Sequence, residues 1–370
     1  MDWSQFPLAH IANPKVRDGA YGARQRAVLN REAFAAARAE ISRWPGYAPT
    51  PLRSLAEVAR STGVARVDYK DESGRFGLGS FKALGGAYAV GRRIGASGRP
   101  ARDIVVTCAT DGNHGRSVAW GAKRFGCGCV IYVHETVSEG RARAIAAYGA
   151  EIRRVPGTYD DAVRQAARDA AANGWIVVSD TSYAGYTDIP RDVMQGYAVM
   201  VDEALGALDR PPTHVFVQAG VGGLAAAVCG HLWEMLGDAR PRTVVVEPDR
   251  AACLFESARQ GRAANIGGAL DTAMAGLACG ETSLLAWEIL EEGAGDFLTV
   301  TDQAAFAAMR LLAPGIVAGE SAVAGLAGLL GAAARPELAR AIGLDRSSRV
   351  LLFGSEGDTD PELYRKIVDR

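Results

Sequence analysis

The stretch His214-Val-Phe-Val-Gln-Ala-Gly-Val-Gly-Gly-Leu-Ala225 decides the fold class. It begins with an apolar run rich in β-branched and aromatic residues, continues through a glycine turn, and ends in a segment typical of a helix. In an α/β fold, such a turn lies at the carboxyl edge of the sheet, where ligands bind. Glycines allow backbone N–H groups to approach a phosphate closely. The stretch therefore predicts a phosphate-binding turn between a strand and a helix.

Apolar runs alternate with helical segments along most of the chain. Further strands are predicted at 67–70, 103–107, 129–133, 152–155, 175–178, 243–246 and 350–353. Helices of ordinary length lie between them, and one example covers 159–173, opened by Thr158 and closed by Gly174. This alternation indicates an α/β protein with mostly parallel sheets. Because 370 residues are many for one core and no linker marks a boundary, we expect two interleaved lobes.

The composition is that of an ordinary globular protein, with 48% hydrophobic residues and a net charge of -1. This charge gives no electrostatic reason to expect binding to nucleic acid or to an anionic membrane. The first residues lack the basic start and apolar core of a signal peptide, so a cytoplasmic location is expected. The six cysteines are spread thinly, which favours reduced thiols over a disulfide scaffold, and no metal site is expected.

Lys82 is unusual because only five of the 41 Lys and Arg residues are lysine. It lies in Arg75-Phe-Gly-Leu-Gly-Ser-Phe-Lys-Ala-Leu-Gly-Gly-Ala-Tyr-Ala-Val90, between glycines and apolar residues. Such surroundings are expected to desolvate the amine, lower its pKa and make it nucleophilic toward a carbonyl. The alternative is a structural lysine that extends its ammonium to water at a helix start.

Two other strand–turn–helix stretches carry polar side chains. Thr107-Cys-Ala-Thr-Asp-Gly-Asn-His-Gly115 places Asp111 and Asn113 where backbone N–H groups can hold an anion. Phe353-Gly-Ser-Glu-Gly-Asp-Thr359 places the Ser355 hydroxyl at a strand end, suited to hydrogen-bond a ring nitrogen without charging it. A nucleophilic lysine, a phosphate cradle and this hydroxyl are the parts that bind pyridoxal 5′-phosphate (PLP) as a Schiff base.

With these motifs the chain resembles the diaminopropionate ammonia-lyases, in the tryptophan-synthase-β-like (fold type II) family of PLP-dependent enzymes. The resemblance runs from about Trp44 to near the C-terminus. Its blocks are 44–52, 70–82, 110–115, 180–181, 194–197, 274–281 and 355–360. Threonine dehydratases and serine racemases share the lysine and the glycine turn but usually carry serine at the position of Asp111. In this chain Tyr183 stands where the family is expected to have tryptophan.

The resemblance implies an α/β fold of two interleaved three-layer lobes with mostly parallel sheets. Residues 1–83 and 196–370 would form a large PLP-binding domain, and 84–195 a small mobile domain inserted in the chain. The implied assembly is a homodimer. The implied reaction is α,β-elimination of ammonia from D- and L-2,3-diaminopropionate, giving pyruvate and two ammonia. The alternative is a PLP-dependent dehydratase or lyase acting on serine, threonine or 3-hydroxyaspartate.

The resemblance also implies roles for individual residues. Lys82 and Asp111 would take the Cα proton on opposite faces of the cofactor, and either Asp111 or Asp180 would partner the leaving amine. The implied cofactor-binding residues are Phe81, Lys82, Asn113, Gly220, Val221, Gly222, Gly223, Leu224, Glu320 and Ser355. For Glu320, capping of the next helix is an equal alternative.

Two other functions compete with this interpretation. Gly220-x-Gly222-x-x-Ala225, with Glu247 at the end of the next strand, also matches the dinucleotide fingerprint of nicotinamide-dependent oxidoreductases. That function would leave Lys82 and Ser355 without roles. A PLP-fold binding protein without turnover is the second alternative, and the intact Lys82 and Asp111 speak against it. Cys253 and Cys279 are expected to be reduced thiols near the mouth of the site.

Overall fold

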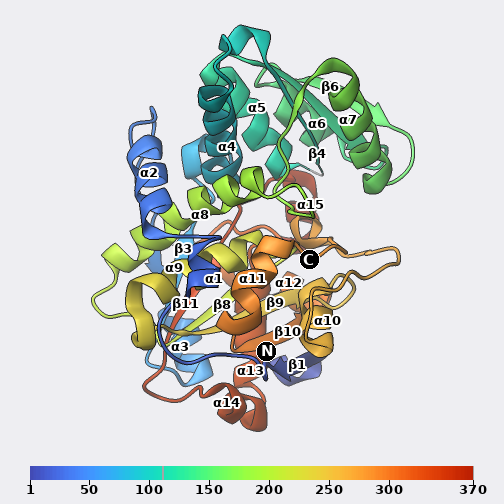
Figure 1. Ribbon diagram of the computed structural model, residues 1–370. Helices are drawn as coiled ribbons and strands as arrows, with labels where there is room; N and C mark the ends of the chain where they lie inside the picture. The colour runs from blue at the N-terminus through green and yellow to red at the C-terminus, as the bar shows by residue number, and fades with distance from the viewer. Residues whose placement is uncertain (111, 370) are drawn as a thin grey trace.

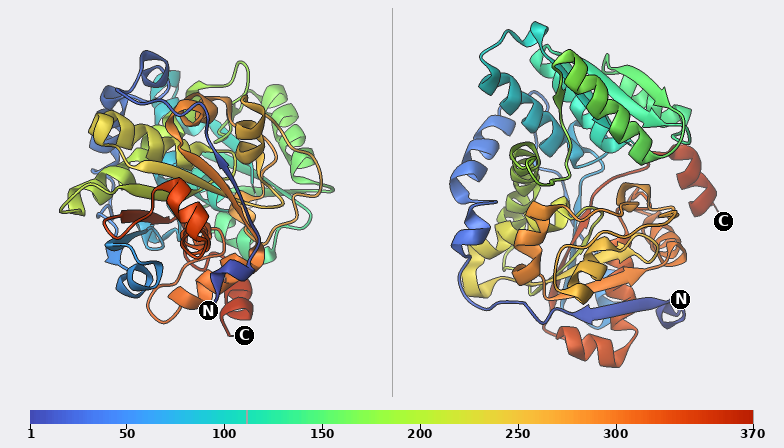
Figure 2. Two further views of the ribbon diagram at one scale, coloured as in Figure 1. Left: turned by 90° about the horizontal axis from the view of Figure 1, so that it is seen from below. Right: turned by 45° about the vertical axis from the view of Figure 1, so that its right-hand side comes forward.

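The larger of two sheets forms the centre of the protein. The computed structural model describes residues 1–110 and 112–369. In spatial order the seven strands are β1 (Leu8–Ala12), β10 (Asp296–Val300), β9 (Arg242–Pro248), β8 (His214–Gln218), β11 (Arg349–Gly354), β3 (Arg66–Asp71) and β2 (Leu52–Ser54). The five inner strands are parallel, whereas β1 and β2 pair antiparallel at the two edges. Figure 2 shows the N-terminal segment running along the β10 edge of this sheet.

The smaller sheet has four parallel strands, which all fall between β3 and β8 in the sequence. Their spatial order is β6 (Glu151–Val155), β5 (Gly128–His134), β4 (Val105–Ala109) and β7 (Ile176–Val177). Figure 1 shows this sheet above the larger one, with α8 between them. The predicted domain boundaries at 83/84 and 195/196 fall inside helices α4 and α8, so they stay a prediction.

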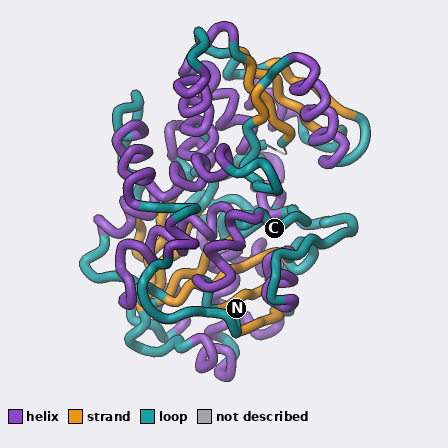
Figure 3. The backbone as a smooth tube through the Cα atoms, in the orientation of Figure 1, coloured by secondary structure: helices purple, strands orange, loops and turns teal. Residues whose placement is uncertain are grey.

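Helices cover the sheets, as Figure 3 shows with helices in purple around strands in orange. In the part of the chain that the structure describes, the α-helices are α1 (Ala23–Arg26), α2 (Arg31–Ile41), α3 (Ala56–Thr62), α4 (Lys82–Ser97), α5 (Asn113–Phe125), α6 (Glu139–Ala146), α7 (Tyr159–Asn173), α8 (Asp188–Ala207), α9 (Gly223–Leu236), α10 (Cys253–Gln260), α11 (Leu284–Gly293), α12 (Asp302–Leu312), α13 (Ala324–Ala333), α14 (Pro336–Ile342) and α15 (Pro361–Val368). None of the described helices has the length and apolarity needed to cross a membrane.

Alternation along the strands explains why helices lie on both faces of each sheet. In β8, Val215 and Val217 belong to the core that contains α9, whereas Phe216 belongs to the core that contains α13. In β5, Val130 and Tyr132 pack with α7, whereas Ile131 and Val133 belong to the core that contains α5. Successive strand residues point to opposite faces, so a strand made only of apolar residues is buried on both sides. The expected α/β fold with mostly parallel sheets is therefore confirmed.

The strand ends determine where a site can form. All eight predicted strands are present, with ends that differ from the prediction by up to two residues. The edge strands β1 and β2 and the inner strand β10 were not predicted. The carboxyl ends of β3, β8 and β11 lead into the segments that carry Lys82, the glycine turn and Ser355. The three separate sequence motifs thus come to one edge of one sheet, where α/β proteins bind ligands.

Candidate functional site

Lys82 is the first residue of α4, and its amine faces Asp180. Lys82 Nζ lies 2.5 Å from Asp180 Oδ2, and both side chains are largely buried. The amine also lies 5.5 Å from the ring centroid of Phe81 and 5.9 Å from that of Tyr197. Burial by itself lowers the pKa of Lys82, but the Asp180 carboxylate outweighs it and holds the pKa above the usual value. The expected lowered pKa is therefore wrong.

Asp180 is held ionised, and His114 supports it from α5. Burial opposes the charge of Asp180, but Lys82 and then His114 lower its pKa well below the usual range. His114 Nε2 lies 2.7 Å from the carbonyl oxygen of Val178, so it donates there, and Nδ1 lies 3.7 Å from Asp180 Oδ2. Burial also lowers the pKa of His114 below its usual value. Asp180 is thus a carboxylate that stays charged inside the protein.

The glycine turn joins β8 to α9 and leaves backbone donors open. The N–H groups of residues 221–224 have no hydrogen-bond partner among the described residues, and no side chain caps the helix. Gly222 has a φ of +105°, a conformation that L side chains rarely adopt. A Cβ on Gly222 would lie 2.9 Å from the Cβ of Ala286, and one on Gly220 would lie 3.1 Å from Cys279 Sγ. Gly222 therefore needs glycine, Gly220 leaves little room for a side chain, and the turn presents the donors that a phosphate requires.

Ser355 follows β11 and is buried beside Gln218, the last residue of β8. Gln218 Nε2 donates to Ser355 Oγ over 2.8 Å, so the serine hydroxyl hydrogen stays available to another acceptor. The carbonyl of Ser355 accepts from the N–H of Phe81 over 3.0 Å, which ties β11 to the start of α4. This geometry suits a hydroxyl that donates to an uncharged ring nitrogen. Gln218 was not singled out from the sequence, although its place at a strand end was visible.

The turn before α5 connects to Glu356. Asn113 Nδ2 donates to the Glu356 carboxylate, and Glu356 also accepts from the N–H of Ser321 over 3.3 Å. Glu356 was missed by the sequence reasoning, although it directly follows Ser355. Asp111 lies outside the described residues, so its predicted role is addressed only as a proposal.

Glu320 is buried between the two sheets and pairs with a residue of the other part of the chain. Glu320 Oε1 lies 3.3 Å from Arg141 Nη2 on α6. Burial and the neighbouring Glu356 raise the pKa of Glu320 to about 8. Helix α13 has no side-chain cap, so the alternative role of Glu320 as its cap is wrong.

Glu247 is occupied in a way that opposes the dinucleotide interpretation. Its carboxylate accepts from the N–H groups of Leu254 over 2.9 Å and Phe255 over 2.6 Å, at the start of α10. The side chain is fully buried, and burial raises its pKa to about 8. A carboxylate already used as a helix cap has no oxygen exposed to bind a ribose. The nicotinamide alternative therefore loses its acidic residue.

Cys253 and Cys279 both lie beside Gly220. Cys253 Sγ approaches the carbonyl of Gly220 at 3.5 Å. Among the described residues, which include all six cysteines, none forms a disulfide. In the same part of the chain no cluster of His, Cys, Asp or Glu is arranged to bind a metal ion.

The residues brought together fit PLP. The open N–H groups of the glycine turn suit its phosphate, the Ser355 hydroxyl suits its ring nitrogen, and Lys82 presents an amine beside Asp180. Among the other predicted residues, Phe81 lies next to Lys82. Asn113 and Glu320 lie near Glu356, the residue that follows Ser355.

Comparison with known proteins agrees with this arrangement. Residues 43–353 match the family model for pyridoxal-phosphate dependent enzymes. The chain is 40% identical over 350 residues to diaminopropionate ammonia-lyase of Escherichia coli K12, covering 87% of this chain and 88% of that one. It is also 40% identical over 358 residues to the enzyme of the same name from Salmonella typhimurium, covering 88% and 89% of the two chains.

Solved structures show the same likeness. The chain superimposes on holo diaminopropionate ammonia lyase from Escherichia coli with a TM-score of 0.91 and 36% identity, over 98% of this chain and 97% of that one. A second structure of that enzyme, in complex with an aminoacrylate-PLP azomethine reaction intermediate, gives the same values. Maize serine racemase, with a TM-score of 0.78 and 20% identity over 92% and 98% of the two chains, shares the fold.

Proposed function

Because the chain belongs to the pyridoxal-phosphate-dependent enzyme family, together with the diaminopropionate ammonia-lyases, we propose that it eliminates ammonia from 2,3-diaminopropionate. Both enantiomers are substrates, and the products are pyruvate and two ammonia. The observation that carries the proposal is the contact between Lys82 Nζ and Asp180 Oδ2 at 2.5 Å. It places an amine and a permanent carboxylate at the edge of the sheet where the glycine turn and Ser355 also lie.

The cofactor, bound through Lys82, supplies a conjugated ring that makes the Cα proton of an attached amino acid acidic. The N–H groups of residues 221–224 would hold its phosphate, and Ser355 would donate a hydrogen bond to its ring nitrogen. Since serine is neutral, it leaves that nitrogen uncharged. Gln218 keeps Ser355 in place, because it donates to Oγ and leaves the hydroxyl hydrogen for the ring.

Proton movements then fall to three side chains. The Lys82 amine takes the Cα proton on one face, and Asp111 takes it on the other, so the two enantiomers use different bases. An amine leaves only when it carries a proton. Asp180 is held ionised by its surroundings, so it is suited to bind the substrate's β-ammonium and to keep that group protonated.

The test is an assay of pyruvate released from each pure enantiomer of 2,3-diaminopropionate, with serine, threonine and 3-hydroxyaspartate as comparison substrates. We expect diaminopropionate to be the best substrate and the Lys82→Ala variant to lose both turnover and the near-visible absorption of the bound cofactor. Faster release from any of the other three would assign the site to a different β-substituted amino acid. Full activity of Lys82→Ala would remove the cofactor assignment.

We further propose that residues 84–195 move as a small domain, and that the protein works as a homodimer in the cytoplasm. Contacts of Arg141 with Glu320 and of Asn113 with Glu356 join this segment to the rest of the chain, and they are the contacts that an opening motion would break. Light scattering after size-exclusion chromatography measures the assembly. Small-angle scattering with and without substrate measures the opening.

A further inference from the structure

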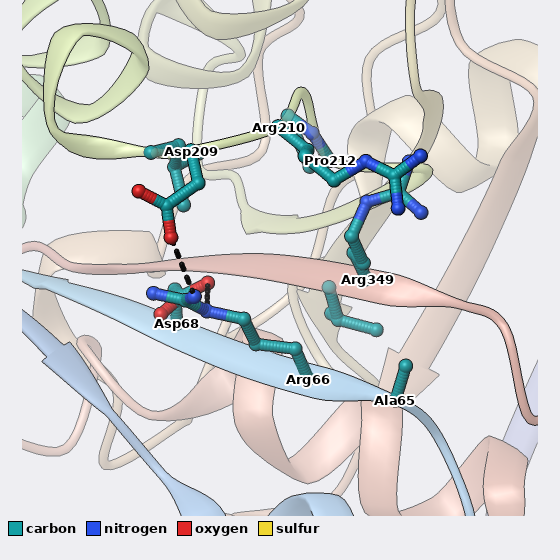
Figure 4. A pocket seen from close by; sticks show the side chains of 9 residues that line it. Ala65, Arg66, Asp68, Asp209, Arg210, Pro212 and Arg349 are labelled. Carbon is teal, nitrogen blue, oxygen red and sulfur yellow. Dashed lines mark hydrogen bonds and ion pairs between the residues drawn. The ribbon is translucent and has the colours of Figure 1, made fainter.

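A cavity with several charged residues in its lining lies at the end of the larger sheet opposite Lys82. It has a volume of about 240 Å³ and is formed by the amino ends of β3 and β11 and by the connection before β8 (Figure 4). Its charged lining residues are Arg66, Asp68, Asp209, Arg210 and Arg349. The strands β3, β8 and β11 carry the candidate site at their other ends. Five or six strand residues span roughly 17–20 Å, so one small ligand cannot contact both places.

One end of this cavity carries two carboxylates beside Arg66. Asp68 is buried, its Oδ2 accepts from Arg66 Nε over 2.7 Å, and burial raises its pKa. Its Oδ1 is buried as well and has no hydrogen-bond partner among the described residues. Asp209 is mostly exposed and contacts Arg66 Nη1 only at 3.5 Å. This loosely held, exposed carboxylate suits an ammonium group that enters next to Arg66.

The other end of the cavity carries two arginines that have no carboxylate partner among the described residues. Arg349 Nε donates to the carbonyl of Pro211 over 3.0 Å, which fixes this side chain but leaves its charge without a carboxylate. Arg210 has no ion pair with any residue that the structure describes. Figure 4 shows both guanidinium groups toward the same end of the cavity, away from Asp68. Two guanidinium groups with open N–H donors suit a carboxylate.

We propose that this cavity is a second, non-catalytic binding site for a small α-amino acid. The ligand's ammonium binds Asp209 beside the Arg66–Asp68 pair, and its carboxylate binds Arg210 and Arg349. Leu208 and Pro212 also line the cavity and give a short side chain an apolar wall. A cavity of about 240 Å³ lies below the size usual for drug-like ligands, which agrees with an occupant of few atoms.

L-Alanine is the probe, because it carries both charges and has no group to lose from its β-carbon. Equilibrium dialysis of labelled L-alanine against the PLP-loaded protein counts all bound molecules, while the cofactor's absorption band reports the Lys82 site alone. We expect two molecules per chain at concentrations up to about 10 mM, one of them invisible to the absorption band. Propionate lacks the ammonium and ethylamine lacks the carboxylate, and each should compete for the second molecule at least ~10-fold more weakly.

Variants locate the second molecule. Arg210→Gln and Arg349→Gln should each weaken its binding ~10-fold or more, with the absorption change unaltered. Arg346→Gln is the matched control, since this exposed arginine precedes β11 but lies outside the cavity, and it should bind as wild type. Because Arg210 is exposed, its variant tests the proposal even if Arg349→Gln does not fold.

Three results would each overturn the proposal. The first is a single L-alanine per chain. The second is a second molecule whose affinity is unchanged in Arg210→Gln, which would place it elsewhere. The third is propionate competing as well as L-alanine, which would make the cavity an anion site. None of these results depends on turnover, so the proposed elimination reaction is tested separately.

Discussion

Replacing Gly222 with alanine perturbs the phosphate-binding turn at its most restricted point. Gly222 has a φ of +105°, and an added Cβ would lie 2.9 Å from the Cβ of Ala286. The left-handed conformation costs an L-residue roughly 1–2 kcal/mol. Forcing a methyl group against a packed neighbour costs roughly 1–3 kcal/mol. We therefore expect Gly222→Ala to lower the free energy of unfolding of the cofactor-free protein by about 2–5 kcal/mol.

Gly95→Ala is the matched control for this variant. Gly95 lies on the exposed side of α4, has no positive φ, and has open space where a Cβ would be added. Alanine is the better helix former, so this control should be as stable as wild type or more stable by about 0.5–1 kcal/mol.

The assay is urea unfolding followed by circular dichroism, with and without added PLP. At a PLP concentration 100 times its Kd, wild type and Gly95→Ala should gain about 2.7 kcal/mol. Gly222→Ala should gain much less, because the strained turn no longer presents its N–H groups to the phosphate. If Gly222→Ala matches Gly95→Ala within about 0.5 kcal/mol in both conditions, the geometry assigned to the turn is wrong.

Three further variants test single residues. Asp111→Asn should depress turnover of D-2,3-diaminopropionate roughly 100- to 10,000-fold and spare the L isomer, and equal losses in the pyruvate assay would refute two separate bases. Asp180→Asn removes the charge 2.5 Å from Lys82 and should lower kcat on diaminopropionate at least ~100-fold, so an unchanged kcat would leave Asp180 without a role. Glu247 keeps a proton up to about pH 8 in the folded state, whereas the unfolded chain loses it near the usual value. Stability therefore falls as pH rises between these values. Glu247→Gln should make the free energies of unfolding at pH 5 and pH 8 more alike, and an undiminished difference would contradict the raised pKa of Glu247.

The pKa of Lys82 shows where sequence reasoning reached its limit. The apolar neighbours of Lys82 are consecutive in the chain, and they correctly predicted that the amine is partly desolvated. The group that decides its charge is Asp180, which is 98 residues away and is brought to 2.5 Å only by the packing of the two sheets. Local sequence therefore singled out Lys82 but gave the wrong direction for its pKa.

Strand β10 was missed by the sequence reasoning for a similar reason. Strand β10 begins at Asp296, and a buried carboxylate is an unfavourable start for an inner strand. It is stabilised there by Arg242, whose Nε lies 2.5 Å from Asp296 Oδ2, and by His10 at 2.8 Å. These partners come from β9 and β1, the two strands on either side of β10. The glycine turn and Ser355 were predictable, because each directly follows a continuous apolar strand.

The amounts of ammonia and pyruvate released from 2,3-diaminopropionate test directly whether the protein eliminates ammonia at Lys82. We expect two molecules of ammonia for each pyruvate with the PLP-loaded wild type, and neither product with Lys82→Ala. Release of ammonia without pyruvate, or both products at an undiminished rate in Lys82→Ala, would contradict elimination at this site.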